Sequence, residues 1–267
     1  MLITIKLAVL NLLPLLITAI GASFSENVGI SNLGLEGSII VGAFSSAIFS
    51  YYFSSAWIGL GLGTLVVLIL ATFQSYLVIN IKTEQVMAGT AYNLLMSSFS
   101  IFILKSIFKV SGNSPAAPLL PNLFSLPILS YFIFIIVFIS YFLIDKIFPK
   151  LLKEKKYFLF IKHISFILSN LFAAFAGMYL SIGRIGYFNP NLSGGRGFIA
   201  LAVTSLANNN PLKIFGIIIL FGMIDIFQYF IEIYNLNIPP SLMFSFPYIL
   251  TLLLLVLQNI LKKKITK

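Results

Sequence analysis

The chain carries very little charge for its length. Only 9% of its 267 residues are charged, whereas a typical soluble domain has about 25%. Three long intervals hold no charged residue at all, namely 37–81, 110–144 and 233–261. A soluble fold could not cover its surface with so few charges, but a surface that faces lipid needs none. The shortage of charge therefore excludes a soluble globular protein.

The chain also lacks the residues on which most enzymes and metal sites depend. It has no cysteine and a single histidine, His163, so neither a disulfide framework nor a thiolate metal site is available. It contains no H-E-x-x-H motif and no G-x-x-x-x-G-K-S/T phosphate loop. We interpret His163 as a residue at the boundary of a span. We expect no catalytic residue, no metal and no cofactor in this chain, so any ATP is hydrolysed by another chain.

Apolar residues are what the chain has in abundance. They make up 59% of the sequence, and the mean hydropathy is +1.04. A transmembrane helix needs roughly 20 of them. The apolar runs and the Gly, Pro and polar residues that interrupt them predict an all-α, polytopic bundle of about eight to nine spans in one domain, 1–267. The expected helices are 5–22, 36–52, 55–80, 84–105, 125–145, 157–181, 211–233 and 241–262, with a short apolar segment at 194–206.

The distribution of lysine predicts the orientation. The net charge of +10 does not indicate nucleic-acid binding, because the lysines lie between spans and at the C-terminus, where the positive-inside rule expects them. The segment 145–156 and the C-terminus should therefore both be cytoplasmic, and 106–124 should lie outside. An even number of crossings must separate the two cytoplasmic segments. The short segment 194–206 must then cross as well, and we expect it to be a broken helix shielded by its neighbours.

Two short motifs resemble each other across the chain. Asn32-Leu33-Gly34-Leu35-Glu36-Gly37 precedes one apolar helix, and Asn191-Leu192-Ser193-Gly194-Gly195-Arg196-Gly197 precedes another. By the orientation above, they enter the membrane from opposite sides. This pattern is expected of an inverted repeat, a common transporter architecture. We therefore predict two repeat halves, roughly 1–145 and 157–267, joined by a short Lys-rich cytoplasmic loop; the alternative is chance similarity between two Gly-rich breaks.

Several segments, in matching order along the chain, resemble the motifs of one transporter family. They are 25–37 and 41–44, then 85–89 and 93–95, 176–183 and 188–202, and finally 210–212 and 247–252. They are similar to the permease subunits of bacterial simple-sugar and nucleoside ABC importers, within the branched-chain amino acid and ribose permease superfamily. Within that family, the resemblance is to the shorter permease of purine-nucleoside importers that use a lipoprotein of the basic membrane protein class.

The resemblance implies a set of partners. It implies a second permease subunit, an ATP-binding subunit that carries ATP, and a substrate-binding lipoprotein, all at the bacterial cytoplasmic membrane. The chain departs from the family in one place. A longer cytoplasmic loop with a motif like A-V-G-E-N-P is the expected ATPase contact in the family, whereas here 141–165 is short and Lys-rich. The candidate substitute for that contact is the cluster Lys153, Glu154, Lys155 and Lys156.

The polar residues at the breaks are the candidates for the substrate pathway. Asparagine can both donate to and accept from a sugar hydroxyl or a base edge, and an aromatic ring at Phe188 or Tyr187 can stack on a flat ligand. Charges at Glu36 and Arg196 are costly in lipid, and these two residues can pair with each other or with backbone. The alternative role for the asparagines is to cap or join helices. The predicted pathway residues are Asn32, Glu36, Asn93, Phe188, Asn191, Ser193 and Arg196.

Two other functions are compatible with a polytopic chain. An ion-coupled secondary transporter would want an acidic residue inside a span, and Asp225 is the only candidate. Asp225 and Glu232 share one face of a predicted helix, where contact with the partner permease is the other interpretation. A membrane-embedded enzyme would need a catalytic constellation, which the chain does not have. The favoured function is a permease subunit that moves a nucleoside or simple sugar.

Overall fold

The computed structural model describes residues 2–110, 112–124, 126–144 and 158–233, together with a few residues between 246 and 256. Helices dominate this part of the chain. A short π-helical turn, η2 (Ser181–Ile185), continues α7, and a small hairpin pairs β1 (Asn122–Leu123) with β2 (Leu126–Pro127). The α-helices are α1 (Leu2–Asn27), α2 (Leu35–Tyr52), α3 (Ala56–Ile79), α4 (Gln85–Phe108), α5 (Ile128–Phe142), α7 (Phe158–Leu180), α8 (Arg196–Leu206) and α9 (Pro211–Ile233).

The predicted all-α membrane bundle is confirmed, and most helix ends fall within a few residues of their predicted places. The predicted helix 241–262 lies almost entirely outside the described residues. Within the described part, three helices are long and apolar enough to cross a membrane, namely Ala56–Ile79, Gln85–Phe108 and Phe158–Ile185. The described stretches of α5, α8 and α9 are apolar but shorter.

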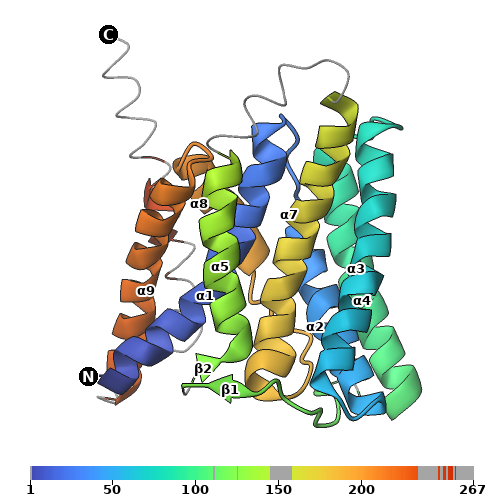
Figure 1. Cartoon of the computed structure of the whole chain (residues 1–267), viewed down its shortest axis with the longest axis vertical. Helices are drawn as coiled ribbons and strands as arrows, with labels where there is room; N and C mark the ends of the chain where they lie inside the picture. The colour runs from blue at the N-terminus through green and yellow to red at the C-terminus, as the bar shows by residue number, and fades with distance from the viewer. Residues whose placement is uncertain are drawn as a thin grey trace.

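The helices run between two ends of the bundle, which we call the upper and lower faces after Figure 1. The first helix rises from the lower face, α3 and α5 also rise, and α4, α7 and α9 descend (Figure 1). The connection between α3 and α4 lies at the upper face, and 109–127, with the small hairpin, lies at the lower face (Figure 1). The connection between α3 and α4 and the segment 109–127, most of which was predicted to lie outside, are therefore at opposite ends of the bundle.

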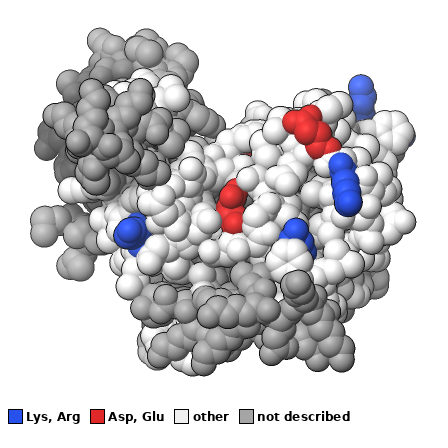
Figure 2. Space-filling model, turned by 90° about the horizontal axis from the view of Figure 1, so that it is seen from above, with Lys and Arg blue, Asp and Glu red and all other residues white. Residues whose placement is uncertain are grey.

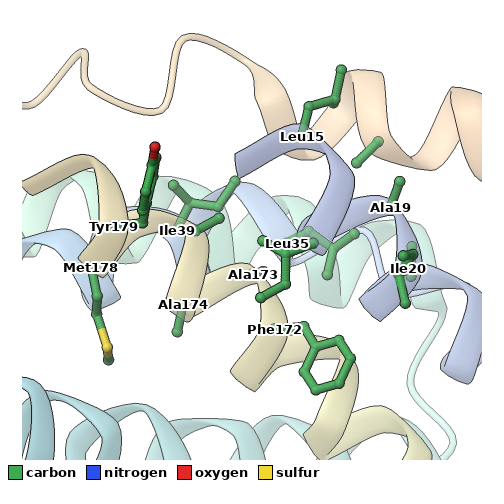
Figure 3. Close-up of a cluster of buried hydrophobic side chains, with 14 of the residues drawn as sticks. Leu15, Ala19, Ile20, Leu35, Ile39, Phe172, Ala173, Ala174, Met178 and Tyr179 are labelled. Carbon is green, nitrogen blue, oxygen red and sulfur yellow. The ribbon is translucent and has the colours of Figure 1, made fainter. Parts of the chain in front are cut away.

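The core forms where α1, α2 and α7 cross. Figure 3 shows side chains from all three helices meeting there, including Ile20, Ile39 and Ala173, each with no exposed surface. A side chain at Gly177 of α7 would collide with the backbone of Ile39. Small residues let helix backbones approach this closely, which is how helices pack where lipid removes the hydrophobic drive. The first helix bends around this core at Pro14 (Figure 1), because proline cannot complete the helical hydrogen-bond ladder.

The outer surface is apolar, as a lipid-facing surface should be. Large side chains on α3, α4 and α5 point away from the bundle, among them Ile69 (68% exposed), Leu94 (72%) and Phe138 (77%). Viewed from above, the described part of the upper face shows only a few charged side chains, scattered among uncharged atoms (Figure 2). Lys82 and Glu84, in the connection between α3 and α4, are two exposed charges of opposite sign.

Candidate translocation site

Two non-helical segments enter the bundle from opposite faces. The first break, 28–34, follows α1 from the upper face and leads into α2. The second break, 186–195, follows η2 from the lower face and leads into α8. Each of the two helices starts inside the bundle and runs to the face opposite the one from which its break came (Figure 1). With only 11 residues, α8 is about 16 Å long, whereas the hydrocarbon core of a bilayer is about 30 Å thick. The second break therefore supplies the rest of this crossing.

The two helix starts meet at Glu36. Its carboxylate Oε1 accepts from the backbone N–H of Gly195 at 2.9 Å, and its Oε2 accepts from that of Gly197 at 2.7 Å. The first N–H groups of a helix have no partner within that helix, and they carry partial positive charge. The carboxylate at the start of α2 thus accepts hydrogen bonds from N–H groups at the start of α8, although Glu36 and Gly195 are 159 residues apart in the sequence.

Glycine makes this meeting possible. Gly195, the residue before α8, has φ of +73°, a conformation that glycine adopts without steric cost. A Cβ at Gly197 would collide with the backbone nitrogen and Cα of Glu36. Any larger residue at position 197 would therefore push the two helix starts apart. The Gly-rich composition of the second motif is explained by these two requirements.

Side chains from neighbouring helices hold the first break. Asn93 of α4 accepts from the Gly37 N–H and donates to the Leu33 carbonyl oxygen, both at 2.7 Å. Asn32 accepts from the Gly34 N–H at 3.1 Å and donates to Ser169 Oγ of α7 at 3.2 Å. These bonds satisfy backbone and side-chain groups that would otherwise be unpaired in a region without water. The first break is thus fixed inside the helical packing.

The second break is held mainly by its own turns and by one loop. Asn189 Oδ1 accepts from the Asn191 N–H at 2.7 Å. The loop that follows α4 then lies along the beginning of the break, where Ala117 N–H donates to Gly186 O and Phe188 N–H donates to Ser114 Oγ at 2.9 Å. This loop covers the second break from the lower face.

A comparison with protein families identifies the chain. Residues 5–147 match the family described as branched-chain amino acid transport system, permease component. The match spans more than half of the chain. The chain belongs to this family. It is therefore a multi-pass membrane permease of the ABC transporter type and not an enzyme, and it works with ATP-binding and substrate-binding partners.

Three other permease proteins are similar to this chain. The guanosine ABC transporter permease protein NupQ of Bacillus subtilis is 27% identical over 91% of this chain and 87% of its own length. The nucleoside ABC transporter permease protein NupC of Lactococcus lactis is 30% identical over 40% of this chain and 37% of its own length. The putative glucose ABC transporter permease protein TsgC13 of Haloferax volcanii is 25% identical over 85% of this chain and 77% of its own length. No solved structure matches the chain.

The structure brings most of the predicted pathway residues to one place. Asn32, Glu36, Asn93 and Ser193 are buried at or beside the two helix starts. The contacts of Asn32 and Asn93 are those of residues that cap and join helices, which was the alternative role. Their role in lining a pathway stays a prediction.

The other predicted pathway residues take different positions. Asn191 is exposed. Phe188 has no exposed surface, and its ring packs edge-on against Phe44 with centroids 5.2 Å apart, so it is not available for stacking in this conformation. The guanidinium of Arg196 donates to the carbonyl oxygens of Leu192 and Ser193.

Some predicted residues fall elsewhere. The cluster 153–156, predicted to contact the ATPase, and the side chains of Asp225 and Glu232 lie outside the described residues. His163 of α7 shares a hydrogen bond of 2.7 Å with Ser75 of α3. Its interpretation as a residue at the boundary of a span stays a prediction. Within the described part of the chain, no group of three or more His, Asp or Glu residues could hold a metal ion.

Sequence reasoning missed two buried amides. Asn170 of α7 accepts from Ser38 Oγ of α2 at 2.6 Å, and Gln74 of α3 lies against the first break. Both stand in otherwise apolar stretches, which is the signal that would have found them, because a polar side chain inside a span is rarely without a role.

Proposed function

We propose that this permease imports a purine nucleoside, with guanosine as the first candidate, and that the solute passes the point where the starts of α2 and α8 meet. The observation that carries the proposal is the Glu36 carboxylate bonded to the N–H groups of Gly195 and Gly197. Non-helical backbone at membrane depth is tolerated where it is buried in protein or lines a polar path. Transporters place their solute sites at such paired breaks.

The chemistry of the breaks suits a neutral polar solute. Amides, hydroxyls and helix N-termini outnumber fixed charges there, and they can exchange hydrogen bonds with ribose hydroxyls and base edges. The similarity to a guanosine permease and to a nucleoside permease supports the nucleoside. A simple sugar is the second candidate, supported by the similarity to a putative glucose permease over most of both chains.

We further propose that the two breaks belong to an inverted repeat with halves of roughly 1–145 and 157–267. The first helix rises to the first break and α2 descends from it, whereas α7 descends to the second break and α8 rises from it (Figure 1). The two segments, each a helix, a break and a second helix, run in opposite directions, and this supports the inverted repeat.

The proposed assembly contains a second permease subunit, an ATP-binding subunit that holds ATP, and a substrate-binding lipoprotein, in the bacterial cytoplasmic membrane. We place the upper face in the cytoplasm, because α5 ends and α7 begins at this face (Figure 1). The sequence between these two helices is rich in lysine, and positive charge favours the cytoplasm. The lysines at the C-terminus favour the cytoplasm by the same rule, and the cluster 153–156 is the proposed contact with the ATPase.

The orientation is testable because the chain contains no cysteine. Single variants Lys82→Cys, at the upper face, and Phe124→Cys, at the lower face and 86% exposed, are treated in intact cells with a maleimide that does not cross the membrane. We expect labelling at position 124 only. Labelling at position 82 only would reverse the orientation.

Transport itself is tested by uptake. Cells that depend on this permease should accumulate tritiated guanosine or inosine, and cells without the gene should not. Uptake should stop on ATP depletion and survive an ionophore that collapses the ion gradient. Uptake of labelled glucose in place of every nucleoside would select the second candidate. Transport that survives ATP depletion but not the ionophore would instead support an ion-coupled mechanism.

A further inference from the structure

One buried amide in the bundle has no hydrogen-bond partner. Gln74 lies on the inner face of α3, is 2% exposed, and neither its Nε2 nor its Oε1 is hydrogen-bonded to any described residue. Other buried amides near it are hydrogen-bonded through both their nitrogen and their oxygen. Asn93 donates to Leu33 and accepts from Gly37, and Asn170 donates to Phe166 and accepts from Ser38. Among the buried side chains that the structure describes, the Ser130 hydroxyl is the one other group without a hydrogen-bond partner, so Gln74 is the only unpaired amide.

This unpaired amide has a cost. A buried amide without partners loses its hydration and gains no hydrogen bond in return, so it lowers the stability of the folded state. An unbranched apolar side chain of the same length, such as methionine, would fill the space without that loss. A buried polar group that stays unpaired needs a specific explanation, and inside a span such a group points to function.

The position of the amide suggests what its partner is. Gln74 Nε2 is the nearest atom to the place that a side chain at Gly34 would occupy, and the Tyr92 ring lies next to it. Gly34 is the residue before α2, the helix whose start meets α8. The amide thus points at the helix start beside the site of the proposed path, where α2 presents N–H groups and partial positive charge.

We propose that Gln74 is a solute-contacting residue of the translocation path. Its amide donates to and accepts from the ribose hydroxyls or the base edge of the passing nucleoside, and it is left without a partner when the path is closed at this level. The inference rests on the proposed function. It adds a contact on α3, outside both breaks, and a solute class with adjacent donors and acceptors, which an amide matches.

The test uses Gln74→Met in the full importer reconstituted in vesicles, with tritiated guanosine outside and ATP supplied to the ATPase. We expect the maximal uptake rate to fall about tenfold, the effect of one lost hydrogen-bonding group in apolar surroundings. We expect the midpoint of thermal unfolding to rise by about 2 °C, because an unpaired amide has been removed. A residue that only supports the fold would move both quantities in the same direction.

A matched control is Gln85→Met. Gln85 of α4 is a bonded amide, because its Oε1 accepts from the Ser31 N–H at 2.9 Å, so the same substitution should lower the midpoint. Gly34→Ala is a second variant. Its new methyl group would displace the Gln74 amide, so uptake should fall here too.

Three outcomes overturn the inference. They are an uptake rate for Gln74→Met within about threefold of the wild type, a lowered midpoint for that variant, and unchanged uptake for Gly34→Ala. Failure of the proposed function is seen separately, because the wild-type importer would then take up no nucleoside before any variant is compared.

Discussion

The two breaks have the same role in the chain but are held in different ways. The first break, 28–34, is bonded by side chains of α4 and α7, and these side chains are buried. The second break, 186–195, is bonded by its own turns, by the loop 113–120 and, at its last residue, by Glu36, and several of its residues are partly exposed. One break therefore belongs to the packed core, whereas the other is covered by a surface loop.

This difference indicates which break can move. Opening the first break would require α4 or α7 to lose buried hydrogen bonds. Most of the hydrogen bonds that other segments make to the second break come from a loop at the lower face, apart from the bond between Glu36 and Gly195. Local opening is easiest where few buried contacts are lost. In a transporter with alternating access, the second break is thus the better candidate for the mobile side, and Glu36 links its movement to α2.

The largest effect is expected from breaking the link between the two breaks. Gly197→Val places a branched side chain against the Glu36 backbone, so α8 can no longer start beside α2. We expect uptake to fall at least tenfold, since a buried clash with backbone costs several kcal/mol. The control is Gly61→Val on α3, where nothing lies within 4 Å, and its uptake should match the wild type. Normal uptake in Gly197→Val would mean that the helix starts need not meet.

Removing the carboxylate tests the link without a clash. Glu36→Ala leaves the N–H groups of Gly195 and Gly197 unpaired, which should cost about 3 kcal/mol. The expected fall in thermal midpoint is about 6 to 12 °C. Glu36→Gln keeps one carbonyl acceptor and should lose about half as much. Equal midpoints for the two variants would contradict the role of Glu36 as a two-fold acceptor.

The anchoring of the first break is tested at Asn93. Asn93→Leu preserves the approximate size of the side chain but removes both bonds of 2.7 Å. A loss of about 2 kcal/mol is expected, together with faster amide hydrogen exchange in 28–37. If exchange there stays slow, the first break is held by something other than Asn93.

The smallest effect is expected at the cover of the second break. Ser114→Ala removes the acceptor of the Phe188 N–H and should cost about 1 kcal/mol. Hydrogen exchange should rise in 186–195 and stay unchanged in 28–34. Faster exchange in both breaks would mean that they open together, and the contrast between a core-bound and a loop-covered break would then be wrong.

Most of the fold was predictable because the relevant signals are local. Long uncharged runs mark the spans, and Gly, Pro and Asn mark where they stop, so the predicted 36–52 and 211–233 correspond closely to α2 and α9. The short segment 194–206 was predicted as part of a broken crossing, and α8 with its break is one. The similar motifs around Gly34 and Gly195 were visible as a pair for the same reason.

The contacts at the site were less predictable. Pairing of Glu36 with Arg196 or with backbone was left open, and the structure shows the carboxylate bonded to two N–H groups of the second motif. The burial of Phe188 and the unpaired amide of Gln74 had no sequence signal that distinguishes them from an exposed ring or a bonded amide, because both depend on which helices become neighbours.

The sequence by itself determined that this chain is a helical membrane permease, where its spans and breaks lie, and that it has no catalytic machinery of its own. Hydropathy, charge and helix-breaking residues act additively over a few turns, so these properties can be found from neighbouring residues alone. Only the tertiary structure decided that the starts of α2 and α8 meet, that one break is anchored in the core and the other is covered by a loop, and that Gln74 is buried without a partner. Hydrogen-bond satisfaction in a membrane depends on the crossing of helices distant in sequence, and no local pattern specifies that crossing.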